Sequence, residues 1–526
     1  MATPEHEGVR KMAKGREGTL IATCTRPGFA RAVASAAGVV ALIATVAACS
    51  SSDSSSSASG TESGSASAPI ATAVDVSSVK LLDIPAGNGI PQSSATVALT
   101  DEGEQAPSLG TSYTEAEYLL QGTATTYSGP AAGPATPTTT TNAYVTRILV
   151  RRPKDDTAFS GRAIIEPMNT TGGAEIAPIW SQAAPMLQAE GDAWIGVTER
   201  AGSVAELQKF DAVRYAGVSL PTSDAAWDIL RQLGGMLKEG SAQSPLHGLR
   251  PAHVYMAGYS QSGVDTATFG SAFTDSTRMA DGSPVYDGFL PAAHAASMTP
   301  LQAGAATLPT FEFTPMRPLE VPVVDLETQT DVEGFIVEIS PGNNYVNQSA
   351  ATIRRDDADT PSDKFHSEEI AGAPHAAFIP GCDGNASTFP TDHFIEGALA
   401  NLFAWAEEGK APRPASPMDL ATKDVVSVAQ TDTYGNAVGG VRSPFLDVPL
   451  SHYEAHSTPG PICKLSGRET PLSADVLAQK YSSSSDYMSQ FTKSLDATID
   501  AGYLRSADRD TILTMAQSKA KALLGG

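Results

Sequence analysis

The chain has 526 residues, of which 35 are Lys or Arg and 58 are Asp or Glu, so its formal net charge is −23. A balance this acidic argues against nucleic acid and anionic membrane surfaces as binding partners, because both would repel it. The length leaves room for several domains, but the N-terminal region has the composition of a targeting segment and not of a folded core.

The N-terminal segment resembles a bacterial export signal. Six basic residues between Arg10 and Arg31 precede an uncharged run, 33–48, which is shorter than the roughly 20 residues needed to span a bilayer. The run ends in Val46-Ala47-Ala48-Cys49, which resembles the lipobox of bacterial lipoproteins. We therefore predict a signal peptide over 1–48 and a lipid on Cys49, with a single transmembrane anchor as the alternative. The predicted location is the extracytoplasmic side of the cell membrane, where the lipid anchors the protein.

Two further predictions depend on export. The stretch 50–68 is almost entirely Ser, Ala and Gly, so 49–70 is predicted to be a disordered tether before a single domain over 71–526. Once Cys24 leaves with the signal and Cys49 carries lipid, Cys382 and Cys463 are the cysteines that remain in an oxidising compartment. We expect a disulfide between them, with two buried free thiols as the alternative.

From Tyr113 onward, extended apolar runs alternate with helical ones, as in a βαβ succession. Strands are predicted over 143–150, 163–166, 193–197, 253–257, 289–292, 321–326 and 368–370. Helices are predicted over 176–189, 226–237 and 394–407, followed by a helical tail over 474–524 that is broken near Gly502. The predicted fold class is α/β, with a mostly parallel central sheet flanked by helices and extra helices at the C-terminal end.

The middle of the chain contains a candidate nucleophile. The hexapeptide Gly258-Tyr259-Ser260-Gln261-Ser262-Gly263 lies between the apolar run 253–257 and a small-residue stretch that can start a helix. A sharp strand-to-helix turn raises a serine Oγ above the sheet, and glycines are needed because larger residues would clash. The usual pattern is G-x-S-x-G, but here Ser262 stands where the second glycine belongs. Taken alone, the hexapeptide also fits an ordinary glycine-rich connection in an α/β sheet.

A serine nucleophile needs a histidine to take its proton and a carboxylate to orient that histidine. In the G-x-S-x-G enzymes these residues follow in the order Ser, acid, His. Asp331 is the preferred acid, because it follows the strand that ends at Leu326, and ligand chemistry in such sheets lies at the carboxyl ends of strands. Glu327 is the alternative acid, and Asp325 also competes. Strand alternation places these two on one face, where either could simply be solvated.

The preferred base is His375, which follows a short strand and the turn at Gly372. That placement suits an imidazole that reaches toward Ser260. His393, His452 and His456 are more readily explained as surface or satisfied polar histidines. Chain order removes the other five histidines, which are His6, His247, His253, His294 and His366.

Acyl transfer also needs hydrogen-bond donors for the oxyanion. One predicted donor is the backbone N–H of Gln261, directly after the nucleophile. The other is expected from the turn 169–173, which follows the strand 163–166, with Thr170 and Thr171 as the candidates. An ordinary glycine-rich turn is the alternative interpretation of that segment.

With these residues in place, the chain resembles the α/β-hydrolase superfamily, and within it a bacterial branch known as alpha/beta hydrolase domain-containing proteins. The resemblance spans roughly 113–504 and is carried by the segments 113–118, 168–173, 258–263, 328–332, 371–376 and 434–442. It implies Ser260 as nucleophile, Asp331 as orienting acid and His375 as base. It does not imply a substrate.

The predicted function is a serine hydrolase that cleaves a small-molecule carboxylic ester through an acyl-enzyme. No zinc, P-loop or dinucleotide motif is present, so no metal and no cofactor are expected. The same residues could serve a thioesterase, a peptidase or an acyltransferase. A different class is a catalytically inactive lipoprotein that binds a ligand on a hydrolase scaffold, an alternative that Ser262 favours.

Overall fold

The computed structural model describes residues 73–89, 91–92, 109–171, 174–302, 312–340, 343–347, 353–423, 426–460 and 462–525. The chain divides into two units, Met1–Ser52 and Asp53–Gly526, and every described residue lies in the second. The predicted signal peptide, Cys49 and the predicted tether lie outside the described residues. Within those residues, none of the helices combines the length and the apolar character needed to cross a membrane.

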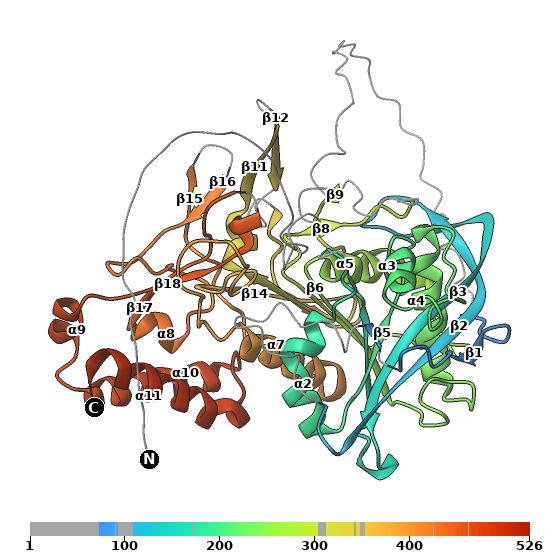
Figure 1. The fold of residues 1–526 in the computed structure, drawn as a ribbon, viewed down its shortest axis with the longest axis horizontal. Coiled ribbons are helices and arrows are strands. Elements are labelled where there is room, and N and C mark those ends of the chain that lie inside the picture. Colours follow the sequence, from blue (N-terminus) through green and yellow to red (C-terminus); the bar gives the residue numbers. More distant parts are fainter. Residues whose placement is uncertain are drawn as a thin grey trace, which may run out of the picture. The chain divides into compact units, whose positions relative to one another are not determined.

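A ten-stranded sheet forms the centre of the second unit (Figure 1). Pairing is parallel from β5 through β14 and antiparallel toward both edges. Because β4 lies between β5 and β6, the loops that follow β4 and β6 meet at one end of the sheet. In spatial order the strands are β1 (Lys80–Asp83), β2 (Tyr113–Ser128), β3 (Thr136–Pro153), β5 (Ala193–Val197), β4 (Arg162–Pro167), β6 (His253–Tyr259), β7 (Gly288–Ala292), β10 (Val323–Thr328), β14 (Asp363–Ile370) and β13 (Ala358–Thr360).

Helices cover both faces of this sheet, which explains why its central strands are continuous apolar runs. Along β6, Val254 and Met256 belong to one apolar core, while Tyr255 and Ala257 belong to the other. The first core is completed by α4 (Ala226–Glu239) and α5 (Gln261–Phe273). The second is completed by α2 (Pro178–Glu190) and α7 (Thr391–Glu408), which contact each other.

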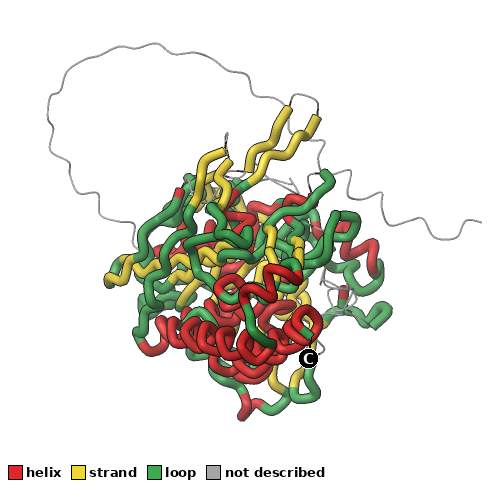
Figure 2. The backbone as a smooth tube through the Cα atoms, turned by 90° about the vertical axis from the view of Figure 1, so that its left-hand side faces the viewer, coloured by secondary structure: helices red, strands yellow, loops and turns green. Residues whose placement is uncertain are grey.

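The C-terminal helices pack against the core that contains α2 and α7. They are α9 (Ala474–Lys480), α10 (Ser484–Ala501) and α11 (Arg509–Leu524), of which α10 and α11 lie side by side (Figures 1 and 2). The predicted break at Gly502 is confirmed, because this residue ends α10 with a φ of 92°. A second break at 481–483 was not predicted. Ser483 causes it by capping α10 through the N–H of Asp486.

All seven predicted strands and all three predicted helices are present; most ends are shifted by a few residues, but β3 and β14 begin well before their predicted starts at 143 and 368. The structure also places a disulfide between Cys382 and Cys463, the pair expected from the sequence. Elements that were not predicted are β1, β2 and several short ones. The short ones are α3 (Ser203–Phe210), α6 (Gln329–Glu333), α8 (Pro444–Asp447), the edge strand β13, and the hairpin strands β8 (Ser297–Met298), β9 (Glu312–Phe313), β11 (Phe335–Ser340), β12 (Asn343–Asn347), β15 (Leu420–Lys423), β16 (Val426–Ala429), β17 (Ser451–Glu454) and β18 (Arg468–Pro471).

Candidate active site

Ser260 alone makes the turn from β6 into α5. Its backbone has φ 60° and ψ −124°, a conformation that L-residues other than glycine rarely adopt and that costs about 1–3 kcal/mol. Two hydrogen bonds hold it there. The Ser260 N–H donates to the carbonyl of Ala292 at 2.9 Å, and its carbonyl accepts from the N–H of Val264 at 2.9 Å. The serine is therefore fixed at the carboxyl end of β6, between the sheet and the helix.

The two glycines of the hexapeptide are both required by close backbone contacts. A Cβ at Gly258 would clash with the carbonyl of Ser262, and one at Gly263 would clash with the carbonyl of Ala292 on β7. Ser262 is fully buried, and its Oγ donates to the Tyr259 carbonyl and accepts from the Tyr259 N–H, both at 3.0 Å. Gly263, which lies one position later than the second glycine of G-x-S-x-G, is therefore required by the close approach of β7.

The structure brings Ser260, His375 and Asp331 together in one hydrogen-bonded line. His375 Nε2 lies 3.0 Å from Ser260 Oγ, and Nδ1 lies 3.0 and 3.1 Å from the two carboxylate oxygens of Asp331. The exposed fraction is 12% for the His375 side chain and 4% for that of Asp331. Because the carboxylate can only accept, Nδ1 carries the proton and Nε2 is free to accept from the serine hydroxyl.

Three neighbours that the sequence analysis did not single out hold this line in place. Thr330 Oγ1 accepts from the His375 N–H at 3.0 Å, and the Tyr259 hydroxyl donates to the His375 carbonyl at 2.7 Å. Thr328 caps α6 by accepting from the N–H of Asp331, so Asp331 lies on a short helix and not in a loop as predicted. The only signal for these residues in the sequence was their position next to the predicted site residues.

Thr170 and Thr171 lie beside the nucleophile, but their donors are engaged. The N–H and Oγ1 of Thr170 both donate to Oε1 of Gln261, at 2.8 and 2.9 Å, and the Thr171 N–H donates to Asn169 Oδ1 at 2.9 Å. The Gln261 side chain is 4% exposed, and its Nε2 is buried with no hydrogen-bond partner among the described residues. The backbone N–H of Gln261 opens α5, where helix geometry provides no acceptor.

Asp325 and Glu327 are not solvated, contrary to the expectation from strand alternation. They do share a face, but that face is covered by His294, whose Nε2 lies 2.9 Å from Asp325 Oδ1 and 3.3 Å from Glu327 Oε1. Burial raises the pKa of Glu327 well above its ordinary value. Burial lowers the pKa of His294, but the charges of Glu327 and Asp325 outweigh it and raise the value to about 9. Glu327 therefore serves a second site, away from His375.

Two clusters within the described residues have donor atoms close enough to hold a metal ion. One is His294 with Asp325 and Glu327, and the other is His393 with Glu396 and Asp508. His294 lies about thirty positions before the two carboxylates of the first cluster, so no metal motif marks these residues. Only the pairing of β7 with β10 brings them together.

A family model described as "Alpha/beta hydrolase domain" matches residues 81–514. The chain belongs to this family. No curated protein matches it. Similar solved structures include an α/β serine hydrolase without a lid from Xanthomonas campestris, at 14% identity and a TM-score of 0.21, covering 40% of this chain and 71% of that one. Esterase 2 of Thermogutta terrifontis has 9% identity and a TM-score of 0.23, covering 35% and 66%. These similarities are too low to add to the family match.

Membership of the alpha/beta hydrolase family agrees with the strand order of the sheet and with the three positions of the hydrogen-bonded line. Ser260 follows β6, Asp331 follows β10 and His375 follows β14, so all three lie at carboxyl ends of parallel strands. This arrangement can deprotonate a serine hydroxyl and direct it at an electrophilic carbon.

Proposed function

We propose that this alpha/beta hydrolase is a serine hydrolase that cleaves carboxylic esters through an acyl-enzyme. The observation that carries the proposal is the line from Ser260 Oγ through His375 to Asp331, anchored on a turn whose strained backbone is held by hydrogen bonds on both sides. Nucleophile, base and orienting acid are within hydrogen-bond distance before any substrate arrives, so the catalytic geometry is preorganised.

The reaction follows from the positions of the protons. As Ser260 Oγ attacks the ester carbonyl carbon, its proton passes to His375 Nε2, and the Asp331 carboxylate stabilises the imidazolium through Nδ1–H. The tetrahedral intermediate then expels the alcohol, which takes the proton from Nε2. Water enters next, gives a proton to Nε2 and attacks the acyl-enzyme. Release of the acid returns the proton to Ser260 Oγ.

The oxyanion donors proposed for this reaction both belong to Gln261. Its backbone N–H is one, and its unpartnered Nε2 is the other, held by the two hydrogen bonds that Thr170 makes to Oε1. Gln261→Ala should then lower kcat by ~10²–10³, the usual cost of one lost donor. If kcat stays unchanged or rises, the N–H and Oγ1 of Thr170 bind the oxyanion directly. The Gln261 side chain then only accepts their hydrogen bonds in the absence of substrate.

The proposed activity is tested with Ser260→Ala and a fluorophosphonate probe. Wild-type protein should hydrolyse p-nitrophenyl acetate and butyrate and react once with the probe, and Ser260→Ala should do neither. Ester hydrolysis by Ser260→Ala at the wild-type rate would exclude the mechanism. A wild-type protein that binds hydrophobic esters but neither turns over nor reacts with the probe would be a ligand-binding protein. Turnover that requires an added alcohol or amine would indicate an acyltransferase.

We also propose that the protein is exported and anchored through a lipid on Cys49. Support comes from the sequence of the N-terminal segment and from the Cys382–Cys463 disulfide, which suits an oxidising compartment. Cys49→Ser in a bacterial host should abolish incorporation of labelled fatty acid and move the protein out of the membrane fraction. Unchanged membrane association without labelling would favour a transmembrane anchor.

A further inference from the structure

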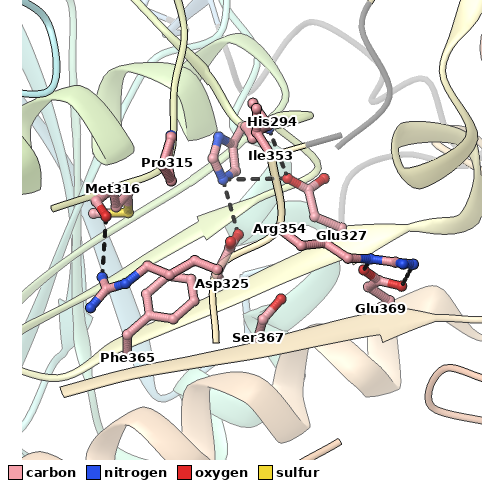
Figure 3. A pocket seen from close by; sticks show the side chains of 12 residues that line it. His294, Pro315, Met316, Asp325, Glu327, Ile353, Arg354, Phe365, Ser367 and Glu369 are labelled. Carbon is pink, nitrogen blue, oxygen red and sulfur yellow. Dashed lines mark hydrogen bonds and ion pairs between the residues drawn. The ribbon is translucent and has the colours of Figure 1, made fainter. Parts of the chain in front are cut away.

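The cluster of His294, Asp325 and Glu327 has the donor set of a metal site (Figure 3). His294 lies just after β7, and both carboxylates project from β10 toward its Nε2. The exposed fraction is 2% for the His294 side chain, 13% for Asp325 and 3% for Glu327. Charges are rarely buried this deeply unless they are paired or coordinate a metal ion.

The separations between donor atoms suit a small divalent ion. For an ion about 2.1 Å from each donor, the 2.9 Å between Nε2 and Asp325 Oδ1 corresponds to an angle of about 90°. The 3.3 Å between Nε2 and Glu327 Oε1 corresponds to about 105°. These two angles lie between those of octahedral and tetrahedral coordination. All three donor atoms lie within 4.8 Å of one another.

The other contacts of these side chains match those of metal ligands. His294 Nδ1 lies 3.3 Å from the carbonyl of Ser297, to which it can only donate, and this leaves Nε2 as the ligating nitrogen. Glu327 accepts from the N–H groups of Ala295 and Ala296 at 3.1 and 3.2 Å, which fixes its carboxylate. Such outer hydrogen bonds typically orient the ligands of a metal.

A divalent cation matches the charge of these ligands. With neutral imidazole and two carboxylates, it brings the net charge of the group to zero. The nearby Arg354 does not supply the missing charge, because it is paired with Glu369 at 2.6 and 2.7 Å. Within the described residues, His294 is the only ion-pair partner of Asp325 and of Glu327.

A cavity of about 30 Å³ opens beside the cluster, and all three ligands line it (Figure 3). This is enough for a water molecule or two, which could complete the coordination of an ion with three protein ligands. One imidazole and two carboxylates suit Zn²⁺ or Mn²⁺ better than the softer Cu⁺.

We propose that His294, Asp325 and Glu327 bind one divalent transition-metal ion, with Zn²⁺ as the first candidate. The ion holds the turn 293–296, where Ala293, Ala295 and Ala296 have φ values of 49°, 51° and 48° and need an external constraint. This turn directly follows Ala292, whose carbonyl accepts the N–H of Ser260. The site is thus coupled to the backbone of the nucleophile without contacting a substrate.

The test uses the tag-free protein, dialysed against EDTA and then titrated with ZnCl₂ or MnCl₂. Elemental analysis after gel filtration should find about one ion per chain, and the Tm should rise with added metal. Glu327→Gln and His294→Gln should lose both responses, while His393→Gln, in the other cluster, should keep them. These measurements do not involve ester hydrolysis, so their outcome is independent of the proposed activity.

Two results would overturn the site. One is wild-type protein that retains less than about 0.1 ion per chain with either metal. The other is metal that is retained by Glu327→Gln but lost from His393→Gln, which would move the site to the second cluster. If the His294 and Glu327 variants do not fold, Co²⁺ substitution of His393→Gln protein decides, because His and carboxylate ligands give visible d–d bands and an unbound ion gives the spectrum of aqueous Co²⁺.

Discussion

Replacing Asp331 with asparagine tests the proposed triad most directly. The substitution keeps the shape of the side chain but presents an amide to His375 Nδ1, now 3.0 and 3.1 Å from the two carboxylate oxygens. An NH₂ group facing Nδ1 favours the tautomer with the proton on Nε2. That proton would point at Ser260 Oγ, 3.0 Å away, so the histidine could no longer act as the base.

The expected loss is about 10⁴-fold in kcat, as found when the acid of a serine triad is replaced in this way. This corresponds to about 5.4 kcal/mol of transition-state stabilisation. The structure supports a loss of this size, because Asp331 is 4% exposed and water cannot readily take over its role. Folding should change little, since the N–H of residue 331 still donates to the Thr328 cap.

The assay is steady-state hydrolysis of p-nitrophenyl butyrate, with circular dichroism and Tm as measures of folding. Glu333→Gln is the matched control, because Glu333 lies on the same helix and pairs with a different histidine, His456, at 3.1 Å. It should stay within about tenfold of wild type. The assignment fails if Asp331→Asn keeps more than a tenth of the wild-type kcat. It also fails if folded Glu327→Gln loses more activity than both Asp331→Asn and metal-free wild-type protein, since Glu327 would then be the acid.

Three further outcomes are expected. Cys382→Ser with Cys463→Ser removes the disulfide, which closes a loop over 81 residues. The gain in chain entropy of the unfolded state should lower the free energy of unfolding in urea by up to about 4.5 kcal/mol. An unchanged urea midpoint would mean that the bond does not constrain the unfolded chain. Burial lowers the pKa of His366, but hydrogen bonds to Asp357 and Glu368 and their charges raise it to about 9. Its stabilisation, on the order of 3 kcal/mol, should be complete below pH 6.5 and disappear as the pH rises through 9, and His366→Gln should flatten that profile. Gly263→Ala should cost about 1–3 kcal/mol by forcing β7 away from α5, more than Ser262→Ala, and equal Tm values for the two variants would contradict the packing seen at the turn.

The parallel part of the sheet could be predicted because its strands are buried on both faces and therefore appear as continuous apolar runs. Of the long hairpin of β2 and β3, only the apolar run 143–150 could be predicted. Buried and exposed residues are mixed along β2, and Gly122 and the Thr-rich stretch 136–142 interrupt the apolar pattern. What defines these strands is their mutual pairing, from Tyr113 opposite Pro153 to Ser128 opposite Thr136, and pairing over such distances is not visible in local sequence.

The sequence also left open which of two carboxylates is the acid of the triad. Asp331 and Glu327 lie four positions apart at the end of one strand, so chain order admits both. The strand pleat directs Glu327 toward His294, whereas α6 begins at Gln329 and turns Asp331 toward His375. The helix has only five residues and is capped by Thr328, a signal too short to predict from propensity.

His294 was set aside because chain order excludes it as the base, but that criterion applies only to the triad. Leu326 of β10 pairs with Ala292 of β7. Asp325 and Glu327 flank Leu326, and His294 is the second residue after Ala292, so this pairing places His294 next to the two carboxylates. Ala292 belongs to both arrangements. Its pairing with Tyr259 of β6 brings its carbonyl to the N–H of Ser260, and its pairing with Leu326 of β10 assembles the His294 cluster. A shift of Ala292 would disturb the nucleophile and the proposed metal site together, which is why loss of the ion should affect the backbone at Ser260.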